Sequence, residues 1–357
     1  MKNKRIERLR AEMRQRSLDA MLISCEENQS WCCNFDFTDG YLLVFDDKAY
    51  LITDGRYIEA AKAEADESFI CVVPKTNIGE TISAYLNEQG SVRVGIEDME
   101  MSYYKVMALK GELYPCEVVM TGRMLDDLRS HKDEDEIECI KHAQRITDKA
   151  FSHILGYIKE GVSERDIALE LEFFMRKNGA DAVSFDIIVA SGSASSRPHA
   201  VPRTCAIERG FVTIDMGCKY GGYCSDMTRT ISFGPADAEM KSMYDTVLKA
   251  QLAALSVIDE GVRCAAVDKA ARDILEREYP GAFSHGLGHG VGRRIHESPR
   301  LSPMAADTRL SRGHVVTVEP GVYIPGKYGV RIEDMVVIGE RCATDITNSE
   351  KQLIEIW

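Results

Sequence analysis

Two pairs of segments in this sequence match each other at a spacing of about one hundred residues. Residues 149–162 match 249–262, with Lys-Ala and Glu-Gly-Val at equivalent places, and residues 211–217 match 315–321, with Val-Thr, an apolar residue and then an acid. Helical and strand patterns recur in the same order, which argues against coincidence. We therefore predict a pseudo-twofold α/β domain, in which each half contains two helices followed by strands and the sheets face a shared central cleft.

The chain length of 357 residues exceeds the usual size of a single hydrophobic core, so two domains are expected. The sequence becomes polar over residues 122–133, and Asp133 followed by Glu136 predicts a capping box at the start of a long helix. We place the domain boundary there, with an N-terminal α/β domain over residues 1–127 and a second domain over residues 128–357.

The N-terminal segment alternates helical and strand patterns. Apolar runs at residues 18–24, 41–45 and 49–53 predict strands, and the short polar break between the last two predicts a hairpin. The first 120 residues contain no histidine. We expect this domain to shape the molecule or to pair with another copy rather than to catalyse.

Composition limits the classes of partner. A net charge of −13 argues against binding to nucleic acid or to an anionic membrane surface, which needs a basic face. No window approaches the roughly 18 uncharged apolar residues of a membrane span, and the charged N-terminus lacks a signal-like apolar region. The 11 cysteines are scattered without a disulfide framework. We expect a cytoplasmic protein with reduced thiols whose partners are small molecules or peptides.

Two pairs of acidic residues bracket predicted turns in the second domain. Asp215 precedes Asp226, and Glu319 precedes Glu333. A hairpin at each midpoint would set the two carboxylates of a pair opposite each other, so four acids are predicted to converge. The turn signals are Tyr220-Gly221 in the first pair and Pro325-Gly326 in the second.

Apolar runs around these acids imply buried strands, where an uncompensated carboxylate costs several kcal/mol. Any one of the acids alone is readily explained by a salt bridge or a turn cap. Only Arg229 and Arg331 lie close enough in the sequence to balance four charges. We therefore expect bound cations.

A nitrogen ligand is available in the glycine-rich segment 283–292, which contains His285 and His289. If this segment is a strand, the two histidines share one face. His289 and the four acids give an O4N set suited to Mn²⁺, Co²⁺, Fe²⁺ or Zn²⁺. Several carboxylates favour two ions, because carboxylates bridge metals about 3.5–4 Å apart.

Three motifs resemble the creatinase/aminopeptidase P/prolidase family of pita-bread (M24-type) metallopeptidases, and the resemblance covers essentially the whole chain. The N-terminal part, with residues 51–57, and the segment 198–200 are similar to Xaa-Pro aminopeptidases and prolidases. The resemblance implies a creatinase-like N-terminal domain and a pita-bread catalytic domain. The motifs are Asp215 with Asp226, Gly288-His289-Gly290, and Glu319-Pro-Gly with Arg331-Ile-Glu333-Asp-Met335.

The resemblance implies two divalent ions, with Mn²⁺ expected first. Asp215 would chelate one ion, Asp226 and Glu333 would bridge both, and His289 with Glu319 would complete the second. A hydroxide between the ions would attack the scissile carbonyl. Glu319 would accept and then donate the proton.

Further residues match positions that the family uses for substrate. His199, His285 and His296 would orient the substrate and stabilise the tetrahedral intermediate, although each alone is equally well explained as a core histidine. Arg300 and Arg331 are candidates for substrate binding, with Arg300 gripping the carboxylate of a short substrate.

One departure from the family pattern follows Gly292, where Arg293-Arg294 replaces an apolar residue. Solvated side chains are the simplest explanation, since arginine is seldom fully buried. Otherwise Arg293 reshapes the substrate pocket.

These observations predict an Xaa-Pro aminopeptidase that acts on proline-containing peptides. The family resemblance implies a homodimer. A dipeptidase of prolidase type shares every residue considered and remains an alternative. A non-catalytic binding module on the same fold is the alternative of another class. Such a module would have lost metal ligands, whereas this chain retains five.

Overall fold

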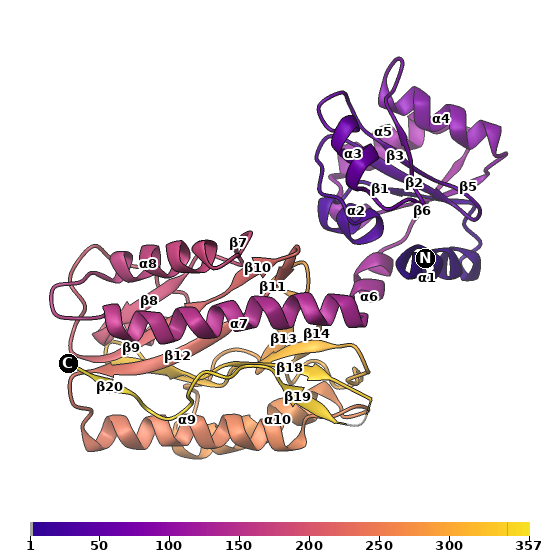
Figure 1. The fold of residues 1–357 in the computed structure, drawn as a ribbon. Helices are drawn as coiled ribbons and strands as arrows, with labels where there is room; N and C mark the ends of the chain where they lie inside the picture. The colour runs from indigo at the N-terminus through magenta and orange to yellow at the C-terminus, as the bar shows by residue number, and fades with distance from the viewer. Residues whose placement is uncertain (1–2, 341) are drawn as a thin grey trace. The chain divides into compact units, whose positions relative to one another are not determined.

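The computed structural model describes residues 3–340 and 342–357. The chain divides into two compact units, Met1–Arg129 and Ser130–Trp357, each with its own hydrophobic cores (Figure 1). This division lies two residues beyond the one that we placed after residue 127. Among the described residues, none of the helices combines the length and the apolar character that crossing a bilayer requires.

The N-terminal unit contains one six-stranded mixed sheet of order β4-β3-β2-β1-β5-β6. The predicted buried strand is confirmed as β1, and the predicted hairpin as the antiparallel pair β2 and β3. Alternate residues of β1 enter two different apolar clusters, so both faces of the sheet are covered. The elements are β1 (Ala20–Ile23), β2 (Tyr41–Phe45), β3 (Ala49–Ile52), β4 (Ile70–Val72), β5 (Arg93–Ile96) and β6 (Glu117–Met120), with helices α1 (Lys4–Gln15), α2 (Glu26–Cys33), α3 (Ile58–Glu64), α4 (Ile78–Glu88), α5 (Tyr103–Glu112) and α6 (Met124–Ser130).

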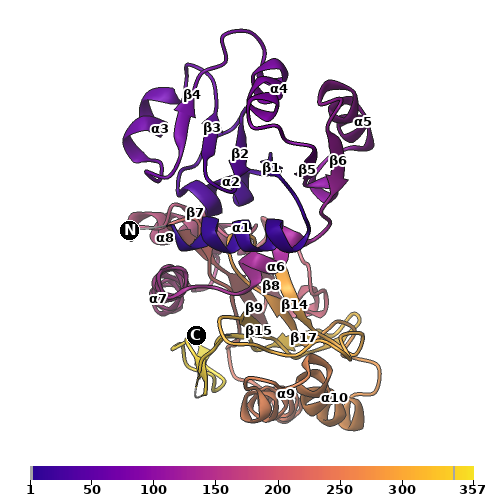
Figure 2. The same ribbon diagram turned by 90° about the vertical axis from the view of Figure 1, so that its right-hand side faces the viewer.

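The C-terminal unit shows the predicted duplication in its helices. Helices α7 (Glu134–Tyr157) and α8 (Glu164–Lys177) form one pair, and α9 (Ala238–Val257) and α10 (Cys264–Glu278) form the other. The capping box of Asp133 and Glu136 is present at the start of α7, as predicted. In both views the two helix pairs lie on different sides of the strands (Figures 1 and 2).

The strands of this unit form two main sheets, of order β20-β12-β9-β8 and β14-β13-β15-β18-β19. Each half contributes one central antiparallel pair, β9 with β12 and β15 with β18, so the pseudo-twofold prediction is confirmed. The strands are β7 (Ala182–Val183), β8 (Ile188–Ser191), β9 (Gly210–Met216), β10 (Cys218–Tyr220), β11 (Tyr223–Cys224), β12 (Met227–Phe233), β13 (Gly288–Gly290), β14 (Glu297–Leu301), β15 (Val315–Val318), β16 (Gly321–Ile324), β17 (Tyr328–Arg331), β18 (Asp334–Ile338), β19 (Ala343–Asp345) and β20 (Glu355–Ile356).

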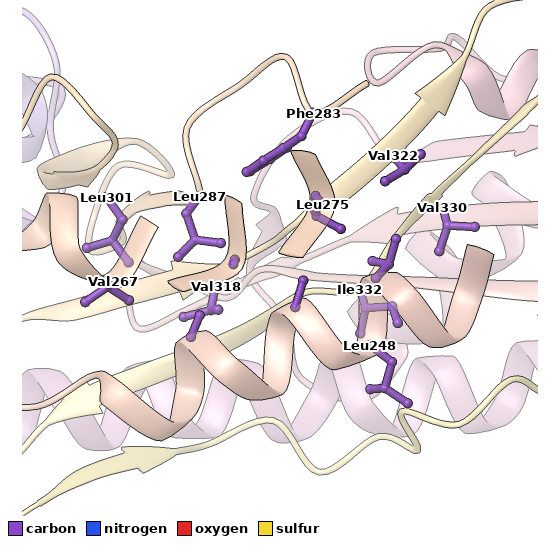
Figure 3. Close-up of a cluster of buried hydrophobic side chains, with 14 of the residues drawn as sticks. Leu248, Val267, Leu275, Phe283, Leu287, Leu301, Val318, Val322, Val330 and Ile332 are labelled. Atoms are coloured by element: carbon purple, nitrogen blue, oxygen red, sulfur yellow. The ribbon is translucent and has the colours of Figure 1, made fainter. Parts of the chain in front are cut away.

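The core under the second half joins helices α9 and α10 to the strands (Figure 3). Leu248 and Leu275 from the helices belong to one buried cluster with Val316 and Val318 of β15. Fully burying each such side chain contributes about 1.5–3 kcal/mol. Because side chains alternate along a strand, Thr317 is directed to the opposite face of β15. Polar groups on that face are thereby held on a rigid, well-packed support.

Candidate active site

A cavity of about 540 Å³ lies within the C-terminal unit. It is lined by all ten residues that the sequence marked as candidate ligands or substrate contacts: Asp215, Asp226, His289, Glu319, Glu333, His199, His285, His296, Arg300 and Arg331. Strands of both halves and the segments next to them supply these residues, so the duplicated halves build one shared site. The role of each residue remains a prediction.

The first acidic pair is held by a register that differs from the predicted one. Asp215 of β9 lies opposite Thr228 of β12, so Asp226 is displaced by two residues from the position that we expected. The turn falls at Gly221 and Gly222, with φ of 58° and 78°, rather than at Tyr220-Gly221. Left-handed φ values at two successive residues are what a two-residue hairpin turn needs. A shift of two residues keeps both carboxylates on one face of the sheet.

The second acidic pair has the predicted register. Val318 of β15 pairs with Asp334 of β18, and Gly321 of β16 pairs with Arg331 of β17. Counting along the chain between these two pairs places Glu319 directly across from Glu333. The turn of the second hairpin contains Gly326, with a φ of 74°, near the expected midpoint.

His289 faces the carboxylates with one ring nitrogen. Its Nε2 lies 3.3 Å from Glu319 Oε1 and 3.5 Å from Asp226 Oδ2. The Nδ1 atom lies 3.1 Å from the carbonyl oxygen of Gly290, which can only accept, so the proton resides on Nδ1. Burial lowers the pKa of His289 to about 3. A neutral ring therefore points a lone pair at two carboxylate oxygens, an arrangement that a cation between them would make favourable.

The pKa values of the acids show that too little positive charge lies near them. Burial, followed by the charges of neighbouring carboxylates, raises the pKa of Asp226 and of Glu333 well above the usual range. Burial also raises the pKa of Glu319 to about 7, although Arg331 opposes the shift. Such shifts mean that the chain lacks enough positive charge for four ionised carboxylates.

One arginine serves this cluster. Arg331 Nη2 lies 2.7 Å from Asp215 Oδ2, and its Nη1 donates to the Tyr323 hydroxyl at 2.9 Å. Arg229, the other candidate, is paired with Asp334 at 2.7 Å instead. In the described ranges, 3–340 and 342–357, no lysine or arginine forms an ion pair with the other three acids of the cluster.

The donor chemistry fits a divalent metal. Ligand atoms of Asp226, His289 and Glu333 all lie within 4.8 Å of one another. Asp215 Oδ1 is buried without a hydrogen-bond partner in the part of the chain that the structure describes. Carboxylate oxygens with one imidazole suit Mn²⁺, Fe²⁺, Co²⁺ or Zn²⁺.

The substrate-side histidines lie at the cavity wall. The sequence left open whether residues 283–292 form a strand; β13 spans only Gly288–Gly290, and His285 lies in a bend before it. Its Nε2 is 3.1 Å from the Tyr323 hydroxyl, and burial lowers the pKa of His285 to about 4. His199, His296 and Arg300 are exposed and line the cavity.

Arg293 does not reshape the cavity wall, nor is it solvated. Its side chain is buried, its guanidinium lies 4.8 Å from the Tyr223 ring centroid, and it is absent from the cavity lining. The Tyr223 hydroxyl in turn donates to Glu136 at 2.8 Å. The stacked, partly desolvated pair stabilises arginine in the interior, so the expectation of a solvated side chain was wrong.

Two supporting threonines were missed from the sequence. Thr228 donates to Glu333 Oε2 at 2.7 Å and accepts from Arg331 Nε at 2.9 Å. Thr317 donates to Glu319 at 3.1 Å and accepts from the backbone N–H of His289 at 3.0 Å. Each threonine lies two residues from an acid of the site, so strand alternation was the signal that pointed to them.

Comparison with known protein families identifies the family of this chain. The model of metallopeptidase family M24 matches residues 138–340, and that of the creatinase/prolidase N-terminal domain matches residues 5–131. The chain belongs to metallopeptidase family M24. It is therefore an enzyme, a hydrolase, and family membership implies divalent metal ions. The binding-module alternative loses its support.

Similar family M24 members carry related names. An uncharacterized peptidase, YqhT, from Bacillus subtilis (strain 168) is 40% identical over 98% of this chain and 99% of its own length. The structure of an Xaa-Pro dipeptidase from Bacillus anthracis is 40% identical with a TM-score of 0.94, covering 99% of both chains. That of an X-Pro aminopeptidase from Thermotoga maritima MSB8 is 33% identical with a TM-score of 0.91, covering 97% of this chain and 100% of its own. The expected creatinase-like and pita-bread architecture is thereby confirmed.

Proposed function

We propose that this M24 peptidase removes the N-terminal residue that precedes proline in a peptide, as an Xaa-Pro aminopeptidase. The observation that carries the proposal is a cavity in which four carboxylates and a neutral imidazole converge while one arginine balances one of them. Names containing Xaa-Pro or X-Pro among similar proteins support the choice of bond.

In this proposal the O4N set holds two divalent ions, with Mn²⁺ the metal to test first, then Co²⁺, Zn²⁺ and Fe²⁺. Bound ions of this kind polarise a carbonyl and lower the pKa of water. The residues that would hold them are Asp215, Asp226, His289, Glu319 and Glu333.

The chain's own residues would move the proton and position the substrate. Glu319, with its pKa raised to about 7, suits a group that accepts a proton and then donates it near neutral pH. His285 is neutral at that pH, so we assign it a hydrogen-bonding role on the substrate. His199 and His296 are exposed at the cavity wall, where they can contact bound peptide.

The proline preference would rest on shape. An Xaa-Pro bond is a tertiary amide without an N–H, so a proline site needs apolar contact and no acceptor for that hydrogen. Pro198, Val201 and Ile295 provide apolar surface in the cavity lining.

A dipeptidase of prolidase type is the second candidate, and Arg300 favours it. This side chain is exposed in the cavity lining, where its guanidinium can bind the free carboxylate of an Xaa-Pro dipeptide. Arg331 is less available for that task because it already pairs with Asp215.

Purified protein is stripped with a chelator, reloaded separately with Mn²⁺, Co²⁺, Zn²⁺ or Fe²⁺, and assayed on Ala-Pro and Ala-Pro-Ala. Formation of the dipeptide Pro-Ala from Ala-Pro-Ala supports the aminopeptidase, and cleavage of Ala-Pro alone supports the dipeptidase. Arg300→Ala should impair only Ala-Pro cleavage. No turnover of either peptide with any of the metals would contradict the proposal.

Two further predictions concern assembly and location. Light scattering tests the homodimer, and cell fractionation tests the cytoplasmic location.

A further inference from the structure

One acid in the cavity lining lies outside the proposed metal-binding set. Asp186 lines the cavity and its side chain is exposed. Within residues 3–340 and 342–357, no hydrogen bond or ion pair engages its carboxylate. Asp186 therefore presents its carboxyl group to whatever enters the cavity.

Asp186 lies just before strand β8 (Ile188–Ser191), in a segment that lines the cavity. Ile187 and Val189 enter the apolar cluster that includes side chains of helices α7 and α8. Ile188 of β8 lies opposite Asp215 of β9 and lines the cavity. Asp186 precedes Ile188 by two residues and lines the same cavity, but it is not one of the five predicted metal ligands.

Distance decides which cation of a peptide can reach Asp186. Asp186 lies two residues before Ile188, so their α-carbons are at most about 7 Å apart. The free amine of an N-terminal residue lies only about 2.5 Å from its own carbonyl carbon, so it stays beside the metal-binding acids. The charged head of lysine or arginine, on its long flexible stem, reaches about 6 Å from the α-carbon.

The neighbouring wall suits such a stem. Phe185 and Ile188 flank Asp186 and both line the cavity. Long basic side chains bury their methylene groups on apolar surface and place the charged head at a polar end. Apolar walls with a carboxylate at one end are complementary to arginine or lysine.

We infer that Asp186 is a specificity-determining residue that favours arginine or lysine as the residue before proline. The inference rests on the proposed Xaa-Pro cleavage and adds the preferred class of first residue. The guanidinium or ammonium pairs with the Asp186 carboxylate while the stem packs on Phe185 and Ile188.

The test compares Arg-Pro-Ala with its neutral isostere, citrulline-Pro-Ala, in the Mn²⁺-loaded enzyme. The unaltered protein should show a kcat/KM about tenfold higher for the arginine peptide, as expected for a partly solvated charge-assisted contact. Asp186→Asn should bring that ratio to about one. Its kcat/KM on Ala-Pro-Ala should stay within about twofold of the unaltered value, because alanine does not reach Asp186.

Two controls isolate the position and the charge. Glu160→Gln removes one exposed acid outside the cavity lining and should leave the ratio unchanged. The pair Ala-Pro-Arg and Ala-Pro-citrulline should respond equally to Asp186→Asn. Asp186→Lys should reverse the preference toward Glu-Pro-Ala.

Several results would overturn the inference. They are equal rates for Arg-Pro-Ala and citrulline-Pro-Ala, an equal loss on every substrate in Asp186→Asn, or an effect confined to the Ala-Pro-Arg pair. If unaltered protein cleaves Ala-Pro-Ala, such results leave the proposed function standing. Failure to cleave any Xaa-Pro peptide would overturn the proposed function and the inference together.

Discussion

Glu333 and Asp334 are sequence neighbours and both are buried, yet they face opposite environments. Asp334 lies 2.7 Å from Arg229 and 2.8 Å from Lys351, and Gln251 also donates to it. Glu333 faces the cavity, where Thr228 is its hydrogen-bond donor. The two side chains diverge because successive residues of an extended chain point to opposite faces.

The comparison teaches when a buried acid indicates a ligand. Where the chain supplies the cation, as around Asp334, the acid stabilises structure. Where it does not, as around Glu333, burial and then neighbouring carboxylates raise the pKa of the acid, and we propose that a metal ion supplies the missing charge.

The largest expected effect comes from removing a charge on the cavity side. Glu333→Gln should lower kcat/KM on Ala-Pro-Ala by about 1000-fold or more, because metal-ion catalysis supplies several kcal/mol of transition-state stabilisation. Bound metal, measured by elemental analysis, should fall too. The free energy of unfolding of the metal-free protein should not decrease, since like-charge repulsion is relieved. A metal-free variant that unfolds much more readily would contradict the comparison.

Around Asp334, where the chain supplies the cations, Arg229→Met should lower the free energy of unfolding. Loss of the guanidinium leaves the buried Asp334 with Lys351 as its paired cation and Gln251 as a neutral donor, and breaking such a buried pair costs about 3–5 kcal/mol. The urea midpoint of metal-free protein measures the effect. Arg312→Met, at an exposed pair with Glu340, is the matched control and should cost less than about 1 kcal/mol. Equal effects of the two substitutions would refute the distinction.

The acids that face the cavity should also make the stability of the metal-free protein depend on pH. The pKa of Glu319 is raised from 4.5 to about 7, so between these values the folded metal-free protein holds a proton that the unfolded chain releases. Its contribution to stability is full below about pH 4.5 and is lost as the pH rises through 7, by on the order of 3 kcal/mol.

Urea unfolding at pH 5, 6, 7 and 8 tests this linkage. Glu319→Gln should reduce the loss of stability of the metal-free protein as the pH rises, while the raised pKa values of Asp226 and Glu333 leave part of the loss in place. Saturating Mn²⁺ should remove the loss of stability at high pH. If the stability of the unaltered protein and that of Glu319→Gln change with pH to the same extent, Glu319 carries no such pKa shift.

The smallest expected effect concerns Thr228, which links Glu333 to Arg331. Thr228→Val keeps the shape and removes both hydrogen bonds, so metal affinity or kcat/KM should fall about 10–100-fold. Thr228→Ser retains the hydroxyl and should stay near the unaltered activity. Equal losses in the two variants would point to packing rather than to hydrogen bonding.

Much of the fold was predictable because its signals are local. The capping box at Asp133 requires only side chains one helical turn apart, and the hairpin of β2 and β3 follows from two apolar runs and a polar break. The first acidic hairpin was misjudged by two residues, because Tyr220-Gly221 and Gly221-Gly222 are both acceptable turns. Pairing of the flanking strands chose between them.

The sequence by itself determined which chemistry this protein can support: a duplicated frame, two pairs of acids that bracket turns, a histidine in a glycine-rich segment, and too few basic residues near them. Only the tertiary structure decided which arginine reaches which acid, where Arg293 packs, and that Asp186 enters the cavity. These outcomes depend on contacts between residues far apart in the sequence. Charge attraction between such residues is set by distance and burial in the folded chain, which spacing along the sequence does not specify.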